Sequence, residues 1–216
     1  MKYKSKMSFW FSKIAKVKRY YLSDYHYREL LNKYNDILIY YNLIKEIPNK
    51  NPKYTSETIK VLDNTSLENI TQKKVKGKFG EPNWMINYKQ YSYNITIIFY
   101  RIILGGYKTK LEFHFVNNEL FFYNYHFSYL NDSDRHKLLK ILEKKYLNNN
   151  TFKWKNDFIV DKENSIITLE NSINFKINYI VQNKDFFNQI KKIVLQQKLK
   201  NNLKKKIKNK ELLEKL

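Results

Sequence analysis

The alternation of apolar and polar residues is clearest in the middle of the chain. Residues 93–104 are dense in β-branched and aromatic side chains, residues 107–116 alternate with period two, and residues 120–127 form a third apolar run. Gly105-Gly106 and Asn117-Asn118 separate the three runs, and both pairs tolerate the positive φ angles of two-residue hairpin turns. The pattern therefore predicts an antiparallel three-stranded meander.

Two-residue turns also predict the register, which places Leu104 opposite Tyr107 and Phe113 opposite Phe122. One face is then apolar and is expected to line the core: Ile98, Tyr100, Leu111, Phe113, Phe115, Leu120 and Phe122. The other face mixes rings with charged groups: Ile97, Phe99, Arg101, Lys108, Lys110, Glu112, His114, Phe121, Tyr123 and Tyr125. This second face is either an open surface that stacks bases and holds phosphates, or a second buried face beneath a helix.

Before the meander, helical spacing of apolar residues predicts a helix from a cap at Ser23 or Asp24 to about Glu46, which Pro48 ends. Residues 48–56 are polar and are expected to form a linker.

After the meander, Asn131 or Asp132 caps a predicted helix that ends near Tyr146. A weaker meander follows at residues 158–181, and a last helix begins near Asp185. Three strands followed by a helix therefore occur twice, as in a βββα pseudo-repeat. The expected class is α+β, an antiparallel β-meander with flanking helices and a long basic C-terminal helix. The expected units are a basic amphipathic arm at 1–22, a helix and antiparallel-sheet domain at 23–150, a second small meander with helix at 151–196, and a Lys-rich helical tail at 197–216.

Residues 71–84 read Thr-Gln-Lys-Lys-Val-Lys-Gly-Lys-Phe-Gly-Glu-Pro-Asn-Trp. Thr71 can cap a short helix, Gly80 suits the left-handed position after its last turn, and Pro82 prevents continuation. With the meander that follows, residues 65–127 resemble the β-lactamase-inhibitor-protein-like fold shared by small outer-membrane assembly lipoproteins. The resemblance implies helices before a three- or four-stranded sheet, in a protein that binds other proteins without catalysis. The chain lacks the cysteine that a lipoprotein of this class lipidates.

The charge of the chain points to an anionic partner. Among 216 residues, 41 Lys and Arg stand against 20 Asp and Glu, which gives a formal net charge of +21. Such an excess predicts attraction to nucleic acid or to an acidic protein surface. The candidate nucleic-acid-binding residues are tail lysines together with basic and aromatic residues of the second face: Lys198, Lys200, Lys204, Lys205, Lys206, Lys208, Lys210, Arg101, Lys108, Lys110, Tyr123 and Tyr125.

Residues 7–22 form a basic amphipathic pattern. If this segment is helical, Trp10 and Phe11 lie on one side, while Lys13 and Lys16 lie on the other. Such a helix can contact an anionic membrane, and the alternatives are docking on the sheet or an extended arm. We find no signal peptide and no apolar run long enough to span a bilayer. The expected location is cytoplasmic, with peripheral membrane contact as the alternative.

The sequence carries no catalytic motif. Its four histidines lack metal-ligand spacing, and no cysteine is present as a nucleophile or thiolate ligand. Glu112 and His114 could act as an acid–base pair only across a cleft, and the expected register places His114 and His126 on opposite faces. We therefore expect a non-enzymatic binding protein without cofactor or metal that contacts RNA or a ribonucleoprotein. The alternatives are a protein-binding module, such as an inhibitor, immunity protein or assembly adaptor, or a peripheral membrane protein.

Overall fold

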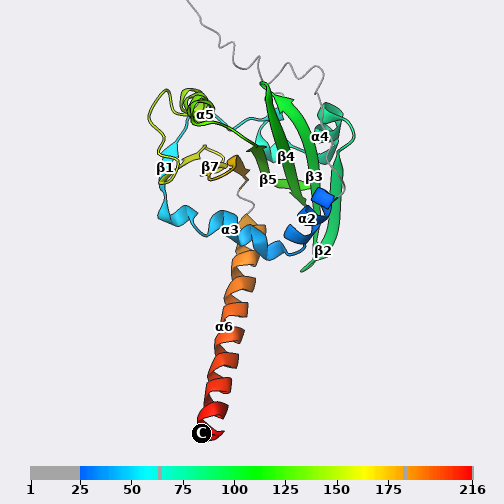
Figure 1. Cartoon of the computed structure of the whole chain (residues 1–216), viewed down its shortest axis with the longest axis vertical. Helices are drawn as coiled ribbons and strands as arrows, with labels where there is room; N and C mark the ends of the chain where they lie inside the picture. The colour runs from blue at the N-terminus through cyan, green and yellow to red at the C-terminus, as the bar shows by residue number, and fades with distance from the viewer. Residues whose placement is uncertain (1–24, 63–64, 182–183, 216) are drawn as a thin grey trace, which may run out of the picture.

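A computed structural model describes residues 25–62, 65–181 and 184–215 (Figure 1). Its strands are β1 (Asn51–Tyr54), β2 (Trp84–Gln90), β3 (Tyr93–Leu104), β4 (Tyr107–Val116), β5 (Glu119–Phe127), β6 (Asp157–Val160), β7 (Ile166–Asn171) and β8 (Phe175–Ile180). They form one eight-stranded sheet in the order β1-β6-β7-β8-β5-β4-β3-β2. The β1–β6 pair is parallel, and the other neighbours are antiparallel.

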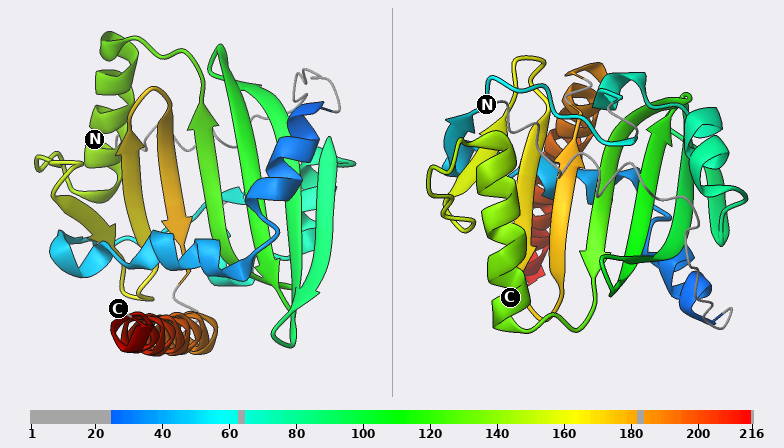
Figure 2. Two further views of the ribbon diagram at one scale, coloured as in Figure 1. Left: turned by 60° about the horizontal axis from the view of Figure 1, so that its bottom comes forward. Right: turned by 90° about the horizontal axis from the view of Figure 1, so that it is seen from above.

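Helices lie on both faces of this sheet (Figure 2). The α-helices are α2 (Tyr25–Lys33), α3 (Tyr41–Ile44), α4 (Gln72–Phe79), α5 (Asp132–Tyr146) and α6 (Lys184–Lys215), and the 3₁₀ turns are η1 (Ile37–Tyr40), η2 (Ile47–Asn49) and η4 (Leu67–Asn69). We call the face beneath α4 and α5 the first face, and the face beneath η1, α3 and the first turns of α6 the second face. The α+β class predicted from the sequence is confirmed.

Each face of the sheet has its own apolar core. On the first face, Val75 and Phe79 of α4 pack with Phe113, and α5 contributes Leu142 and Tyr146. On the second face, the apolar residues of η1 and α6 pack on Ile97, Phe99 and Phe121, which the sequence analysis placed there; these covering residues are Ile37, Tyr40, Phe186, Phe187 and Ile190. Helical segments therefore bury this part of the second face, which agrees with the predicted alternative of a buried face beneath a helix and not with that of an open surface.

The two predicted turns of the meander are confirmed. The φ angles are 58° and 90° at Gly105 and Gly106, and 48° and 72° at Asn117 and Asn118. Leu104 lies opposite Tyr107, and no residue of β3, β4 or β5 is helical. Positive φ at both central positions matches the twist that a two-residue hairpin needs.

The predicted register between β4 and β5 is wrong beyond the first pairs. Phe115 lies opposite Leu120, but His114 lies opposite Phe122, so Phe121 is an extra residue in β5. Such a bulge exchanges the faces of every later residue on its strand. Phe122 therefore joins the second face, whereas Tyr123 and Tyr125 belong to the first core.

The helix predicted from residue 24 to 46 is also interrupted. It stops at Lys33, and η1 begins after Asp36, whose side chain accepts a hydrogen bond of 2.9 Å from the backbone N–H of Leu38. A carboxylate that caps a new turn in this way competes with a continuous helix. The break lets Tyr34 and Tyr40 enter the second core separately.

The expected linker contains an edge strand. Asn51–Tyr54 pairs with β6, although Pro52 cannot donate a hydrogen bond. The strands expected as a second small meander continue the same sheet, because β8 pairs with β5 from Phe122–Ile180 to Phe127–Phe175. The helix caps predicted at Thr71 and Asn131 are confirmed, since their side chains accept from the backbone N–H groups of Lys74 and Asp134.

Candidate functional site

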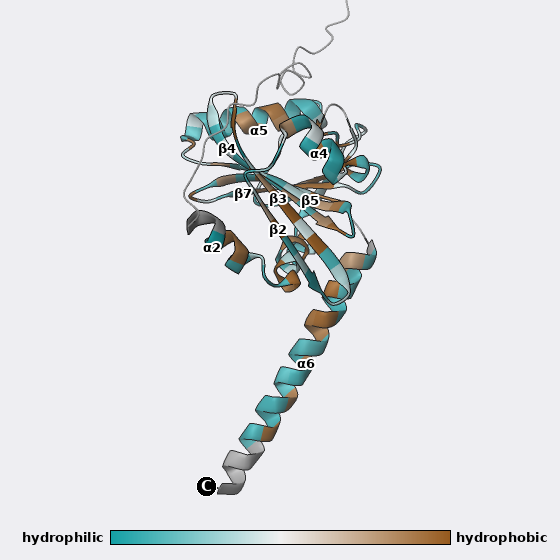
Figure 3. Ribbon diagram, turned by 90° about the vertical axis from the view of Figure 1, so that its right-hand side faces the viewer, coloured by the Kyte–Doolittle hydropathy of each residue, from teal (hydrophilic) through white to brown (hydrophobic). Residues whose placement is uncertain are grey.

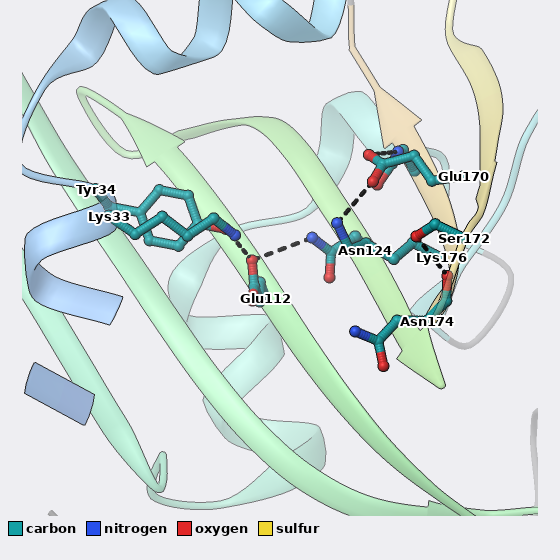
Figure 4. A network of polar contacts seen from close by, with 9 residues as sticks. Lys33, Tyr34, Glu112, Asn124, Glu170, Ser172, Asn174 and Lys176 are labelled. Carbon is teal, nitrogen blue, oxygen red and sulfur yellow. Dashed lines mark hydrogen bonds and ion pairs between the residues drawn. The ribbon is translucent and has the colours of Figure 1, made fainter. Parts of the chain in front are cut away.

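The second face changes character away from the helices that cover it. Figure 4 shows polar side chains from β4, β5, β7 and β8 meeting there beside Lys33 and Tyr34. In register across the sheet, Glu112 lies opposite Asn124, Asn124 opposite Asn178, and Asn178 opposite Thr168. A polar row therefore crosses the middle of the sheet, where an apolar row would be usual.

Glu112 is the centre of this network. Its Oε2 accepts hydrogen bonds from the Tyr34 hydroxyl and from Nδ2 of Asn124, the second at 3.1 Å. Nε2 of His114 lies 3.5 Å from the same oxygen, and the Tyr40 hydroxyl lies 2.9 Å from Nδ1 of His114. Lys33 extends the network to the surface by donating to the Tyr34 oxygen at 2.7 Å.

These contacts set the charge states of the pair. Burial alone would raise the pKa of Glu112, but the contact with His114, the charge of Lys33 and the Tyr34 hydroxyl together hold it well below its usual value. Burial lowers the pKa of His114 although Glu112 opposes that effect. Glu112 is therefore ionised beside a neutral imidazole, whose Nε2–H faces the carboxylate while Nδ1 accepts from Tyr40.

The hypothesis of an acid–base pair at Glu112 and His114 has no support from this geometry. The two side chains lie on one face as neighbours, but they are only 4 % and 0 % exposed. A general base must come within hydrogen-bond reach of a substrate proton, and these groups already contact Tyr34, Tyr40 and Asn124 instead. Within the described residues, no three His, Asp or Glu side chains are placed to hold a metal ion.

One row further along the second face, basic residues face each other on four neighbouring strands. Arg101 of β3 lies opposite Lys110 of β4, Lys110 opposite His126 of β5, and His126 opposite Lys176 of β8. We call these four residues the basic row. Glu170 of β7 lies opposite Lys176 and forms an ion pair with it at 2.6 Å.

The predicted nucleic-acid residues of the sheet are thus separated. Arg101 and Lys110 belong to the basic row, Arg101 buried and Lys110 partly buried, while Lys108 is exposed nearer the turn. Tyr123 and Tyr125 were placed wrongly, because the bulge at Phe121 turns them into the first core. They cannot stack on bases bound at the second face.

Sequence reasoning missed His126, Lys176, Asn124 and Asn178 as members of this site. Lys176 and Asn178 reach it only because β8 pairs with β5, and His126 was assigned to the opposite face. The available signal was the alternation of Lys176 and Asn178 with apolar neighbours on β8, which indicates a polar side to that strand.

The predicted tail lysines lie on α6, which leaves the body of the protein and extends away from it (Figure 1). Its first turns are buried through Phe186, Phe187 and Ile190, whereas all residues from 195 to 209 are exposed. The Nζ of Lys198 lies 5.9 Å from the centre of the Tyr41 ring in the body of the protein. Lys200, Lys204, Lys205, Lys206 and Lys208 lie beyond it, and the side chain of Lys210 lies outside the described part.

The outer part of α6 also carries apolar residues. Leu195, Leu199, Leu203 and Ile207 recur every four residues and are 58–63 % exposed. Figure 3 shows short apolar stretches of ribbon, in brown, between hydrophilic stretches, in teal, along this helix. We call these four residues the apolar stripe.

The membrane prediction for Trp10, Phe11, Lys13 and Lys16 falls outside the described residues and stays a prediction. In the part of the chain that the structure describes, no helix combines the length and the apolar character needed to cross a bilayer.

No known protein family, curated protein or solved structure matches this chain. The resemblance of residues 65–127 to the β-lactamase-inhibitor-protein-like fold therefore stays a prediction, and inference about function rests on the residues themselves.

Proposed function

We propose that this chain is a non-enzymatic binding protein that attaches to a nucleic acid, RNA in the first place, through the outer part of α6. The observation that carries the proposal is the row of exposed lysines on a helix that extends from the body: Lys198, Lys200, Lys204, Lys205, Lys206 and Lys208.

Between the acidic residues near its two ends, α6 carries only positive charge. No acidic residue occurs between Asp185 and Glu211. At a rise of about 1.5 Å per residue, Lys198 and Lys208 are about 15 Å apart along the axis. A duplex presents one phosphate charge per about 1.7 Å of its axis, so several lysines can be neutralised together. Lysines crowded on one helix repel each other, and a polyanion removes that repulsion.

The apolar stripe favours a second candidate function, which is protein binding. Residues four apart share one side of a helix, and lysines flank the stripe, because Lys200 and Lys204 each precede a stripe residue by three positions. A nucleic acid bound to the lysines leaves the stripe in water. An apolar groove with an acidic rim on a partner protein would cover the stripe and pair with the lysines at once.

Salt dependence of RNA binding tests the first candidate. Affinity for single-stranded RNA should fall with salt with a log–log slope of about −0.7 for each phosphate contacted. The quadruple variant Lys204→Gln, Lys205→Gln, Lys206→Gln and Lys208→Gln should flatten that slope by about three units. Circular dichroism should show an intact fold, because these side chains are exposed.

The matched control replaces four exposed lysines of the body, Lys73, Lys140, Lys144 and Lys162, by Gln. Both quadruple variants carry four positive charges fewer, so a difference between them reports position and not net charge. Equal slopes in the two variants would contradict binding through α6.

A third variant separates the two candidates. Leu199→Gln with Leu203→Gln leaves every lysine in place and breaks the apolar stripe. It should leave RNA binding unchanged under the first candidate. Under the second candidate it should abolish capture of a protein partner, whereas RNA should show no measurable binding to the unmodified chain.

A further inference from the structure

The basic row is an arrangement that a sheet normally avoids. Arg101, Lys110, His126 and Lys176 lie directly opposite one another on four neighbouring strands. Like charges in directly opposite positions destabilise a sheet. Desolvation, followed by the charge of Arg101, lowers the pKa of Lys110. At Lys110 the row therefore costs stability in the protein without a ligand, which is typical of residues kept for binding.

Opposite charges act on part of the row, Glu170 on Lys176, and Glu112 and Glu29 on Lys110, where they oppose the effect of Arg101. Glu170 pairs with Lys176, and Nε2 of His126, in the middle, has no hydrogen-bond partner among the described residues. Glu112 lies in the neighbouring polar row, where Tyr34 and Asn124 already donate to its Oε2. An anionic group beside Lys110 and His126 would counter the repulsion and supply an acceptor for the imidazole.

Two buried amides beside the basic row complete the site. Nδ2 of Asn124 donates to Glu112 at 3.1 Å, and Nδ2 of Asn178 donates to Glu170 at 2.9 Å. Ionised carboxylates only accept hydrogen bonds, so the amide nitrogens must face them and the oxygens must face elsewhere. The Oδ1 atoms of Asn124 and Asn178 lack a hydrogen-bond partner among the described residues. The two residues are only 4 % and 3 % exposed.

The basic row and the two amide oxygens require different chemical groups on one ligand. The basic row fits an anion, whereas the two amide oxygens fit hydroxyl or amino donors next to that anion. Asn124 lies opposite Asn178 and two residues from His126 on the same face of β5, so both requirements are met within adjacent positions of the sheet. Buried acceptors without donors are costly, which makes the pair of amides informative.

We propose that the basic row, together with Asn124 and Asn178, binds a sugar phosphate, with the phosphate on Lys110 and His126 and the sugar hydroxyls on the two amide oxygens. Free nucleotides or sugar phosphates and the phosphorylated end of an RNA share this chemistry. The site is independent of the nucleic-acid binding proposed for α6.

Isothermal titration calorimetry with ribose 5-phosphate, inorganic phosphate and ribose tests the proposal. Ribose 5-phosphate should bind at least about tenfold more tightly than phosphate, and ribose alone should not bind at millimolar concentration. Asn178→Ala should reduce the affinity for ribose 5-phosphate to that for phosphate, while phosphate binding stays unchanged. Lys110→Gln should weaken both by about tenfold.

Lys108→Gln is the matched control, because Lys108 lies on the same face of the same strand but is exposed and outside the row. It should bind ribose 5-phosphate as the unmodified chain does. Lys110→Gln should also raise the melting temperature without ligand, since it relieves the repulsion, whereas a lysine that only supports the fold would lower it. The quadruple α6 variant should retain ribose 5-phosphate binding, so failure of one proposal leaves the other standing.

A six-nucleotide single-stranded RNA with and without a 5′-phosphate distinguishes the two sources. Tighter binding of the phosphorylated RNA than of ribose 5-phosphate, again lost in Lys110→Gln, assigns the site to an RNA end. Binding no tighter than that of ribose 5-phosphate assigns it to a free ligand. The proposal is overturned if none of the probes binds at millimolar concentration, if ribose 5-phosphate binds no better than phosphate, or if Lys108→Gln weakens binding as much as Lys110→Gln.

Discussion

At the scale of single residues, Glu112 explains why the second face has a fixed arrangement. A buried carboxylate persists only when hydrogen-bond donors and opposite charges compensate for its desolvation. Its partners come from different parts of the chain, with Tyr34 after α2, His114 on the same strand and Asn124 on β5. Loss of any one of these three partners would leave the buried charge of Glu112 without full compensation. The network therefore holds the segment after α2 against the centre of the sheet.

The pH dependence of stability follows from His114. Its pKa is lowered by burial, so the folded state keeps the imidazole neutral at a pH where the unfolded chain, with a pKa of about 6.5, takes up a proton. The unfolded state then binds more protons, and the free energy of unfolding should fall as pH decreases below about 6.5. We expect a loss of up to about 1.4 kcal/mol per pH unit, measured by urea unfolding between pH 7.5 and 5. Glu112 contributes at lower pH, since its lowered pKa gives stability that is lost only as pH falls through the folded value.

Two variants assign that pH dependence. His114→Gln should flatten the slope between pH 7.5 and 5, even though the variant is less stable overall. His136→Gln replaces an exposed histidine on α5 and should leave the slope as it is. A slope unchanged by His114→Gln would show that the imidazole does not stay neutral in the folded protein.

At the scale of elements, signals that act within a few residues allowed correct predictions. The turns at Gly105-Gly106 and Asn117-Asn118 and the caps at Thr71 and Asn131 depend on local backbone preferences, and all four are present. The bulge at Phe121 could not be predicted, because every residue from 120 to 123 is apolar or aromatic and fits either face equally well. Only packing against η1 and α6 decides which ring faces which core.

The errors in residues 34–54 have a similar cause. Apolar residues recur at helical spacing across the whole predicted helix, yet the chain breaks after Lys33 so that Tyr34 can reach Glu112. The edge strand β1 has a largely exposed, polar sequence with Pro52, and its pairing depends on β6, about 100 residues later. Tertiary contacts of this kind override local propensity.

Two glycines make a matched test of element stability. Gly77 lies inside α4, and a Cβ atom added there would meet no heavy atom within 4 Å, so Gly77→Ala should stabilise the protein by about 0.5–1 kcal/mol. Gly106 has equally open space but a φ of 90°, which a residue with a side chain rarely adopts. Gly106→Ala should therefore destabilise the protein, and both values can be read from urea unfolding. Stabilisation by both substitutions would contradict the turn geometry.

At the scale of the whole molecule, the candidate sites differ in how far the sequence could predict them. The lysines of α6 lie in a local run on one helix, and their exposure follows from having little to bury. The basic row instead joins four strands, and β5 meets β8 across a separation of about 50 residues that includes α5. No short-range pattern encodes that pairing, so Lys176 and Asn178 could not be linked to Lys110 from the sequence.

The same pairing predicts how the molecule unfolds. Residues 23–150 and 151–196 were expected as separate units, but β5 and β8 lie side by side within one sheet, with buried residues on both faces. Amide hydrogen exchange should therefore give the same opening free energy for Tyr123 of β5 and Tyr179 of β8, equal to that of global unfolding. Amides of the edge strand β2, paired on one side only and largely exposed, should exchange at least about tenfold faster through local opening. The contrary outcome is that the amides of β6, β7 and β8 exchange together at a lower opening free energy than those of β3, β4 and β5. The C-terminal strands would then form an independent unit that only docks on the sheet, and the basic row would assemble only when they are docked.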